Sequence, residues 1–180
     1  NSSLFGLNNI HCHLVAQNNS IIVGLKGNSA INSINFRLGK ISPEGSIDSS
    51  FGANGLSFIS LNIDSTILPQ STPIALVEGR DSSLYVLINM VNNRAGLVKI
   101  KYNGVVDSSF GNNGLVYFDI RGLAITPREI SISNNIVYIS GFFQEDKRFK
   151  GFVKAYTSDG KIQWLKSNQA HLEFDNSSDW

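Results

Sequence analysis

Two histidines near the N-terminus are the first candidates for chemistry. His11 and His13 stand two residues apart in I-H-C-H-L-V, a stretch that alternates like a β-strand, so both imidazoles leave the same face. Such a pair can hold a transition metal. His171 is remote in sequence and no third ligand stands nearby, so the pattern favours buried, hydrogen-bonded histidines over a metal site. Cys12 points the other way and is predicted to be a small core residue.

A second candidate is a calcium loop in two similar stretches. Asp48 and Asn54 in D-S-S-F-G-A-N-G, and Asp107 and Asn113 in D-S-S-F-G-N-N-G, are oxygen ligands close together in sequence. Calcium gathers roughly six or more oxygen ligands, usually with several carboxylates, whereas each stretch offers one carboxylate. Turn chemistry explains the motif better, because a short carboxylate accepts hydrogen bonds from amides just ahead and glycine supplies positive φ. We therefore assign a structural role to the repeated motif residues Asp48, Phe51, Gly52, Gly55, Asp107, Phe110, Gly111 and Gly114.

The remaining polar residues predict no enzyme. Serines are abundant, but no strand–turn–helix elbow exists to present one as a nucleophile. Glu173 and Asp175 share one face of a predicted last strand, a spacing that is common by chance and does not indicate glycoside cleavage. We assign no catalytic residue, no cofactor-binding residue and no cofactor, and His11 and His13 stay as weak metal candidates.

These residues are positioned by an internal repeat. The stretch 45–60, G-S-I-D-S-S-F-G-A-N-G-L-S-F-I-S, returns at 104–119 as G-V-V-D-S-S-F-G-N-N-G-L-V-Y-F-D, about 60 residues later. A third copy begins at Gly160 but lacks the Asp, Phe and Gly of the motif, so its loop must be built differently. Phe51 and Phe110 stand in otherwise small, polar loops, and we predict that each ring plugs its loop onto the core between neighbouring repeats.

Each unit is predicted to contain four short strands. Apolar, β-branched runs bounded by turn residues are typical of strands, and no helical periodicity occurs. The expected strands are 10–15, 21–25, 34–41 and 56–61, then 74–77, 84–88, 95–102 and 115–120, then 130–132, 136–140 and 151–156. Four strands per unit is the layout of a propeller blade. We predict an all-β, β-propeller-like fold with three four-stranded blades in one repeat domain, 1–180, divided into repeat 1 (about 10–61), repeat 2 (about 74–120) and repeat 3 (about 129–175).

Composition excludes several classes of partner. Fifteen basic and fourteen acidic residues give a formal charge of +1, and no stretch collects enough Lys or Arg to indicate a nucleic-acid surface. One cysteine excludes a disulfide framework. No run approaches the ~20 apolar residues of a membrane span, so we expect no membrane insertion.

The D-S-S-F-G-x-N-G motif, preceded by P-E-G-S-I-D or Y-N-G-V-V-D, resembles the bacterial delta-60 repeat, a tandem element regarded as propeller-forming. The resemblance covers nearly the whole chain, strongly at 34–61 and 95–120 and weakly at 150–175. It implies a bacterial protein that is secreted, periplasmic or at the cell surface. The family motif is structural, so the resemblance carries over no functional residue.

A second resemblance is local. Residues 155–164, A-Y-T-S-D-G-K-I-Q-W, are similar to the docking element of quinoprotein-type propellers, in which a Trp from each blade locks onto the next. Ser49 and Ser108 occupy the places that match Trp164, so the other two units lack this element. The alternative to a noncatalytic protein is therefore a quinoprotein-type propeller enzyme or enzyme subunit.

Three blades are too few for a ring, since propellers close with about four to eight. The chain is part of a longer array, or two copies join into a six-bladed ring, or open blades pack on another protein. We favour completion by a protein partner or a second copy, because an open propeller exposes blade faces and strand edges. Recognition is expected in the loops 26–33, 89–94 and 142–149. The predicted function is a noncatalytic bacterial surface or envelope binding or scaffold module, free or within a larger assembly.

Overall fold

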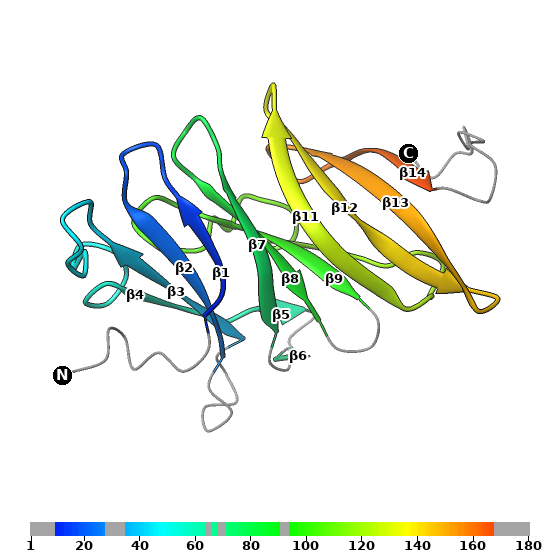
Figure 1. Cartoon of the computed structure of the whole chain (residues 1–180), viewed down its shortest axis with the longest axis horizontal. Coiled ribbons are helices and arrows are strands. Elements are labelled where there is room, and N and C mark those ends of the chain that lie inside the picture. The colour runs from blue at the N-terminus through cyan, green and yellow to red at the C-terminus, as the bar shows by residue number, and fades with distance from the viewer. Residues whose placement is uncertain (1–9, 28–34, 64–65, 68–70, 91–93, 168–180) are drawn as a thin grey trace.

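Three antiparallel four-stranded sheets make up the structure (Figure 1). The computed structural model describes residues 10–27, 35–63, 66–67, 71–90 and 94–167. Sheet 1 comprises β1 (Ile10–Val15), β2 (Ile21–Lys26), β3 (Phe36–Ile41) and β4 (Leu56–Ile59). Sheet 2 comprises β7 (Thr72–Glu78), β8 (Leu84–Asn89), β9 (Ala95–Ile100) and β10 (Leu115–Phe118). Sheet 3 comprises β11 (Ile125–Ser133), β12 (Ile136–Glu145), β13 (Arg148–Thr157) and β14 (Ile162–Ser167).

The connection between sheets 1 and 2 carries the small hairpin of β5 (Asn62–Ile63) and β6 (Thr66–Ile67). Asn35, which is fully buried, fixes both ends of this connection: its Oδ1 accepts from the amide of Leu61 and its carbonyl from the amide of Ser71. The described residues form no helix, and hence none that could cross a membrane.

Each of the three sheets has a β-bulge in its first strand. The pairing of the first two strands shifts between Ile10 and Cys12 in β1, between Pro73 and Ala75 in β7, and between Pro127 and Glu129 in β11. The three bulges occupy the same position of the repeat. The residue just before each bulge pairs with Leu25 in sheet 1, Ile88 in sheet 2 and Gly141 in sheet 3, which are equivalent positions on the second strands. The four-stranded unit seen in the sequence is therefore a three-dimensional repeat.

Side chains alternate across each strand, and both faces of sheet 2 are buried. One face packs on sheet 1, where Leu84, Val86 and Leu115 meet Phe36 and Leu38 in one core cluster. The opposite face packs on sheet 3 in a second cluster, whose members include Leu87, Leu97, Phe118, Val137, Ile139 and Phe152. A buried side chain of this size contributes about 1.5–3 kcal/mol, so the two junctions between sheets carry most of the stabilisation.

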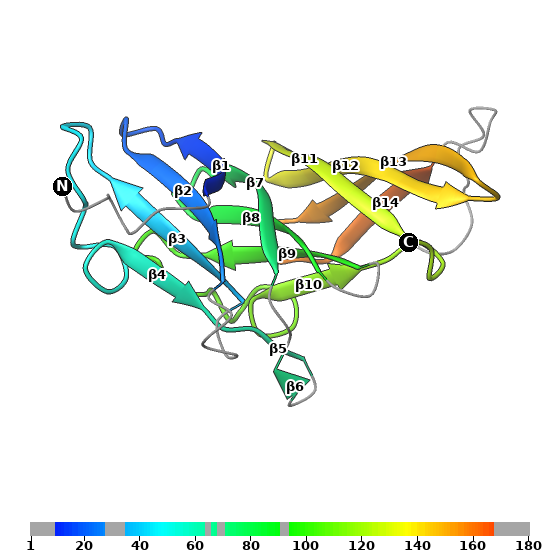
Figure 2. The same ribbon diagram turned by 60° about the horizontal axis from the view of Figure 1, so that its bottom comes forward.

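β7 lies between β1 and β11, and the three first strands lie along one side of the molecule (Figure 2). Each sheet then continues outward in the order first, second, third and fourth strand. This arrangement of three sheets is consistent with a propeller-like fold.

The hairpin of sheet 3 differs from the sequence prediction of a loop over 142–149. β12 continues to Glu145 and β13 begins at Arg148, so the two strands are joined by Asp146 and Lys147 alone. Both of these residues have positive φ, 48° and 61°, as a two-residue hairpin turn requires. The prediction was wrong because the polar and charged residues here lie on exposed strand ends.

The fourth strand of sheet 3 also differs from the prediction. β14 begins at Ile162, directly after the turn at Gly160, and pairs Leu165 with Lys154. In sheet 2 the corresponding pair is Leu115 and Val98, and the whole D-S-S-F-G loop precedes it. The third copy lacks this loop, so its fourth strand lies earlier in the chain than the predicted last strand that carries Glu173 and Asp175. Residues 168–175 lie outside the described residues.

Gly45, Gly104 and Gly160 occupy the same turn position and share φ values of 83°, 87° and 87°. A Cβ added at Gly45 would meet nothing within 4 Å, whereas at Gly104 it would lie 3.1 Å from the backbone nitrogen of Gly52. At Gly160 the same atom would lie 2.8 Å from the nitrogen of Gly111. The last two glycines therefore also allow close approach between sheets.

We expect Gly45→Ala to cost about 1–2 kcal/mol of unfolding free energy, the penalty of the left-handed conformation. Gly104→Ala and Gly160→Ala should cost about 1–3 kcal/mol more, because the added methyl group pushes against the neighbouring loop. Urea denaturation of the three variants measures the difference. Equal losses in all three would contradict this account of the junctions.

Candidate functional site

The D-S-S-F-G loops have the geometry that their sequence predicts. Oδ1 of Asp48 accepts a hydrogen bond from the amide of Ser50 at 3.1 Å, and Oδ1 of Asp107 accepts one from the amide of Ser109 at 3.3 Å. Gly52, Gly55, Gly111 and Gly114 all have positive φ. Each aspartate therefore organises a turn, and its carboxylate is already occupied by the loop itself.

Phe51 and Phe110 are both buried to 1% exposure, each at a junction between sheets. Phe51 belongs to the cluster between sheets 1 and 2, and Phe110 to the cluster between sheets 2 and 3. The ring of Phe110 also meets Tyr85 edge-on, with 5.8 Å between centroids. This placement agrees with the plug predicted from the sequence.

Each loop reaches the turn after the third strand of the next sheet. The amide of Gly52 donates to the carbonyl of Asn103 at 2.9 Å, and the amide of Gly111 donates to the carbonyl of Asp159 at 3.1 Å. The hydroxyl of Ser57 adds a hydrogen bond to the carbonyl of Gly104. Backbone groups thus supply one polar contact at each junction, and in both the amide belongs to the earlier sheet and the carbonyl to the later one.

A buried lysine stands behind each loop. Nζ of Lys40 lies 3.1 Å from Asp48 and 3.8 Å from the ring centre of Tyr102, in sheet 2. Burial disfavours its charge, but hydrogen bonds to Tyr102 and Asp48 outweigh burial and raise the pKa of Lys40. Ser50 and then Lys40 lower the pKa of Asp48. The pair is therefore fully ionised at neutral pH.

The equivalent lysine of sheet 2 has two carboxylate partners. Nζ of Lys99 lies 3.2 Å from Asp81 and 3.6 Å from Asp107. Burial again disfavours the charge, yet Tyr85 and Asp81 outweigh it and raise the pKa of Lys99. The hydrogen bond from Ser109 lowers the pKa of Asp107. Lys99 joins β9 to the β7–β8 turn and to the D-S-S-F-G loop.

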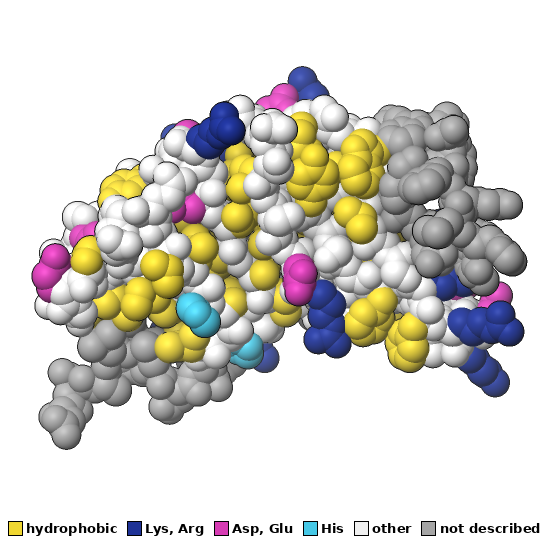
Figure 3. Space-filling view, turned by 45° about the horizontal axis from the view of Figure 1, so that its top comes forward, with side chains coloured by type: hydrophobic (Ala, Val, Ile, Leu, Met, Phe, Trp, Pro, Cys, Tyr) yellow, Lys and Arg dark blue, Asp and Glu magenta, His cyan; other side chains and the backbone are white. Residues whose placement is uncertain are grey.

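The two histidine candidates lie on the surface, and their predicted burial was wrong (Figure 3). His13 is equivalent to Leu76 of β7, and Leu76 is buried because sheet 1 packs on that face of sheet 2. The same face of sheet 1 carries His13 and points away from sheet 2, so no sheet of the described residues covers it. Cys12 between them is buried as predicted, and burial raises the pKa of its thiol to about 12. The described residues contain no group of three or more His, Cys, Asp or Glu side chains that could hold a metal ion.

Trp164 packs within its own sheet. Its ring lies 5.8 Å from that of Tyr138, which faces the same way on β12. The contact therefore differs from the blade-to-blade docking of the quinoprotein element that the sequence around Trp164 resembles. Glu173 and Asp175 lie outside the described residues, as does most of the predicted recognition loop 26–33 and the centre of 89–94.

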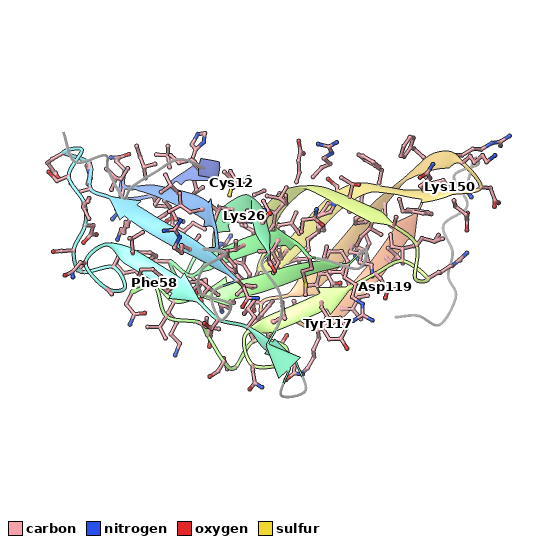
Figure 4. All side chains as sticks on the ribbon, turned by 90° about the horizontal axis from the view of Figure 1, so that it is seen from below. Cys12, Lys26, Phe58, Tyr117, Asp119 and Lys150 are labelled. Carbon is pink, nitrogen blue, oxygen red and sulfur yellow. The ribbon has the colours of Figure 1, made fainter. Side chains whose placement is uncertain are left out.

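Two cavities open where sheets 2 and 3 meet. One, of about 390 Å³, lies beside β10 and is lined by Tyr117, Asp119 and Lys154; Figure 4 shows Tyr117 and Asp119 at this edge. Nζ of Lys154 donates to the carbonyl of Asp119 at 3.1 Å. The other, of about 350 Å³, lies over Lys99. Its volume falls in the range of ligand pockets, about 300–1,000 Å³.

The sequence analysis missed the lysines of these junctions. Lys40 precedes Asp48 by the same number of residues as Lys99 precedes Asp107. This repeated spacing could have indicated a repeated lysine–aspartate ion pair. It was not recognised because lysine on a strand is normally solvent-exposed. The sequence contains only a weak indication of the cavity over Lys99. That indication is the exchange of one turn residue, Tyr102 in the second unit, for the smaller Ser158 in the third.

No protein-family model and no curated protein sequence matches this chain. The resemblance to the delta-60 repeat therefore stays a prediction from the motif.

We expect Phe110→Ala to cost about 3–5 kcal/mol of unfolding free energy, because it opens a cavity in the core between sheets 2 and 3. Phe149→Ala is the matched control, since Phe149 is 71% exposed, and should change stability by about 0.5 kcal/mol or less. Chemical denaturation checks both. Similar small losses in the two variants would mean that Phe110 does not hold the junction.

Acid should weaken the junctions through Asp48 and Asp107. Both have folded pKa values below the ordinary carboxyl value, so their contribution is present at neutral pH and is lost as the pH falls through the folded pKa. We expect the thermal midpoint to fall between neutral pH and about pH 3, below the unperturbed Asp pKa of about 3.9. The double variant Asp48→Asn, Asp107→Asn should start lower and fall less steeply. If the thermal midpoints of the two proteins fall in parallel with pH, other carboxylates account for the loss of stability in acid.

Proposed function

We propose that this chain is a noncatalytic binding and scaffold module whose three sheets are consecutive blades of a β-propeller. A further four-stranded sheet, from a protein partner or a second copy, completes it by packing on the outward face of sheet 1, the face that carries Ile21, Ile41 and Leu56 and turns away from sheet 2. The observation that carries the proposal is that this face repeats the apolar pattern of a buried junction.

The outward face of sheet 1 corresponds position by position to the face of sheet 2 that sheet 1 covers. The corresponding pairs are Ile21 and Leu84, Val23 and Val86, Ile41 and Ile100, and Leu56 and Leu115. Leu84 is 3% exposed, whereas Ile21 is 36% exposed. Val23 at the centre of the face is buried within the chain, while Val15 and Phe58 at its margin are exposed; Figure 4 labels Phe58 on β4. Exposed apolar positions with a junction pattern support docking of another sheet.

The turn after β3 supports the same proposal. In the two junctions, the carbonyls of Asn103 and Asp159 each accept an amide from the preceding loop. The corresponding residue of sheet 1 is Glu44, and no described residue donates an amide to its carbonyl. A Cβ added at Gly45, the next residue, would meet nothing within 4 Å, whereas one added at the equivalent Gly104 would lie 3.2 Å from the ring of Phe51. Sheet 1 therefore presents the receiving half of a junction.

The outward face of sheet 3 has a different chemistry. Ser131 and Ser140 stand where sheet 2 has Val77 and Leu87, and Ser131 is exposed. Hydroxyl groups at the centre of a junction would be buried without their water partners, which is unfavourable. The pattern thus favours sheet 1 as the docking side.

The cellular setting of the proposal rests on the motif. D-S-S-F-G-x-N-G resembles the bacterial delta-60 repeat, which supports a secreted, periplasmic or cell-surface protein. The alternative, a quinoprotein-type enzyme, depends on Trp docking between blades, and Trp164 packs on Tyr138 of its own sheet.

Native mass spectrometry combined with light scattering at rising protein concentration tests the proposal. We expect the chain to dimerise through sheet 1, because a second copy can cover Ile21 and Val15. Ile21→Asp should abolish the dimer and leave the monomer folded, since Ile21 is already partly exposed. The matched control, Ser131→Asp on sheet 3, should leave the dimer intact.

A chain that stays monomeric at every concentration would contradict completion by a second copy. Equal association of the two variants would exclude sheet 1 as the docking face. A retained small-molecule mass would favour the enzyme alternative.

A further inference from the structure

The two junctions are built from the same parts, which allows a direct comparison. Asn18 and Asp81 hold the same place in the turn between the first two strands, and each accepts the amide of the serine two residues ahead, at 3.1 Å and 3.2 Å. Lys40 and Lys99 hold the same place on the third strand, each ion-paired with the aspartate of its loop. The next sheet then supplies one turn residue over the lysine.

At the first junction this turn residue is a tyrosine. The ring of Tyr102 lies over Lys40, with 3.8 Å from Nζ to the ring centre. Its hydroxyl accepts a hydrogen bond from Nδ2 of Asn18 at 3.1 Å. Under this ring the side chain of Lys40 is only 2% exposed. A phenol ring thus fills the space between the lysine and the neighbouring turn.

At the second junction the same turn position is Ser158, and the space remains open. A cavity of about 350 Å³ lies here, lined by Arg80, Asp81, Lys99 and Ser158 together with Tyr85 and Ile132. Tyr85 lines the cavity: its ring centre lies 5.4 Å from Nζ of Lys99, and its hydroxyl donates to the carbonyl of Ser158 at 3.4 Å. The side chain of Lys99 is 10% exposed, five times the exposure of Lys40.

We propose that this cavity binds a neutral phenol ring, either a free phenol or the tyrosyl side chain of a partner, in the place that Tyr102 occupies at the first junction. Lys99 faces the ring as a cation faces an aromatic surface, and Ile132 supplies an apolar wall. The charges around the cavity balance, with Lys99 and Arg80 against Asp81 and Asp107, so no charged ligand is required.

Asp81 determines that the ring carries a hydroxyl. Asn18 donates to Tyr102 at the first junction, but a carboxylate can only accept. The Asp81 side chain is 58% exposed and lines the cavity, and an oxygen such as Oδ2, which pairs with Lys99, can accept a further hydrogen bond. A phenolic O–H donates to it, whereas a plain benzene ring leaves it unused. The site therefore distinguishes phenols from their deoxy analogues.

Titration of ¹⁵N-labelled protein with p-cresol and, separately, with toluene tests the site by NMR. We expect saturable amide shifts at residues 79–83 and at Ser158 with p-cresol, and at least several-fold weaker binding of toluene. N-acetyl-tyrosinamide and N-acetyl-phenylalaninamide repeat the comparison with an amino-acid backbone. Binding of p-cresol alone indicates a free phenol, and binding of both phenols indicates a tyrosyl side chain.

Two variants localise the binding. Ser158→Tyr rebuilds the first junction at the second and should abolish the shifts while raising the thermal midpoint. Tyr102→Ser opens the matching space over Lys40 and should add a second set of shifts at residues 16–20 and 102. Absence of saturable shifts with p-cresol, equal binding of toluene, or unchanged binding to a folded Ser158→Tyr variant would each overturn the proposal. These outcomes are independent of the oligomeric state, and hence of the proposed function.

Discussion

Burial of both faces of the central sheet is the constraint on which this structure depends. Leu84, Val86 and Leu115 of sheet 2 are covered by sheet 1, and Leu87, Leu97 and Phe118 by sheet 3. An isolated four-stranded sheet with two apolar faces would be unstable in water, so neither the strands nor the turns account for the fold by themselves. The repeat exists to make matching faces, and its chemistry is secondary to that packing.

Polar groups then fix how the faces are aligned. Lys40 and Lys99 are buried at the junctions only because aspartates of the D-S-S-F-G loops and aromatic rings compensate for lost water. Backbone bonds from Gly52 to Asn103 and from Gly111 to Asp159 set the position of one sheet on the next. The turn residue next to each buried lysine differs between the junctions: it is Tyr102 beside Lys40 and Ser158 beside Lys99. Variation at the rim of a junction leaves its core intact.

The sequence predicted much of this fold, because turn residues and strand alternation are local properties. The turns at Asp48 and Asp107, the burial of Phe51 and Phe110 and the four-stranded units all follow from short-range chemistry. The exposure of His13 could not be predicted, because it depends on which sheet covers β1. The two-residue turn at Asp146 was missed because charged strand ends look like a loop, and the cavity over Lys99 depends on residues from three separate turns.

Each D-S-S-F-G loop packs on residues that come later in the chain, which has a consequence while the protein is being translated. Phe51 is covered by residues of sheet 2, which the ribosome makes later, and Phe110 by residues of sheet 3. A newly made sheet 1 therefore holds an uncovered aromatic ring until the next unit has emerged, a delay of a few seconds at about 5–20 residues per second. The residues around each ring are mostly Asp, Ser, Asn and Gly, so the ring is the main apolar group that the loop exposes during that interval.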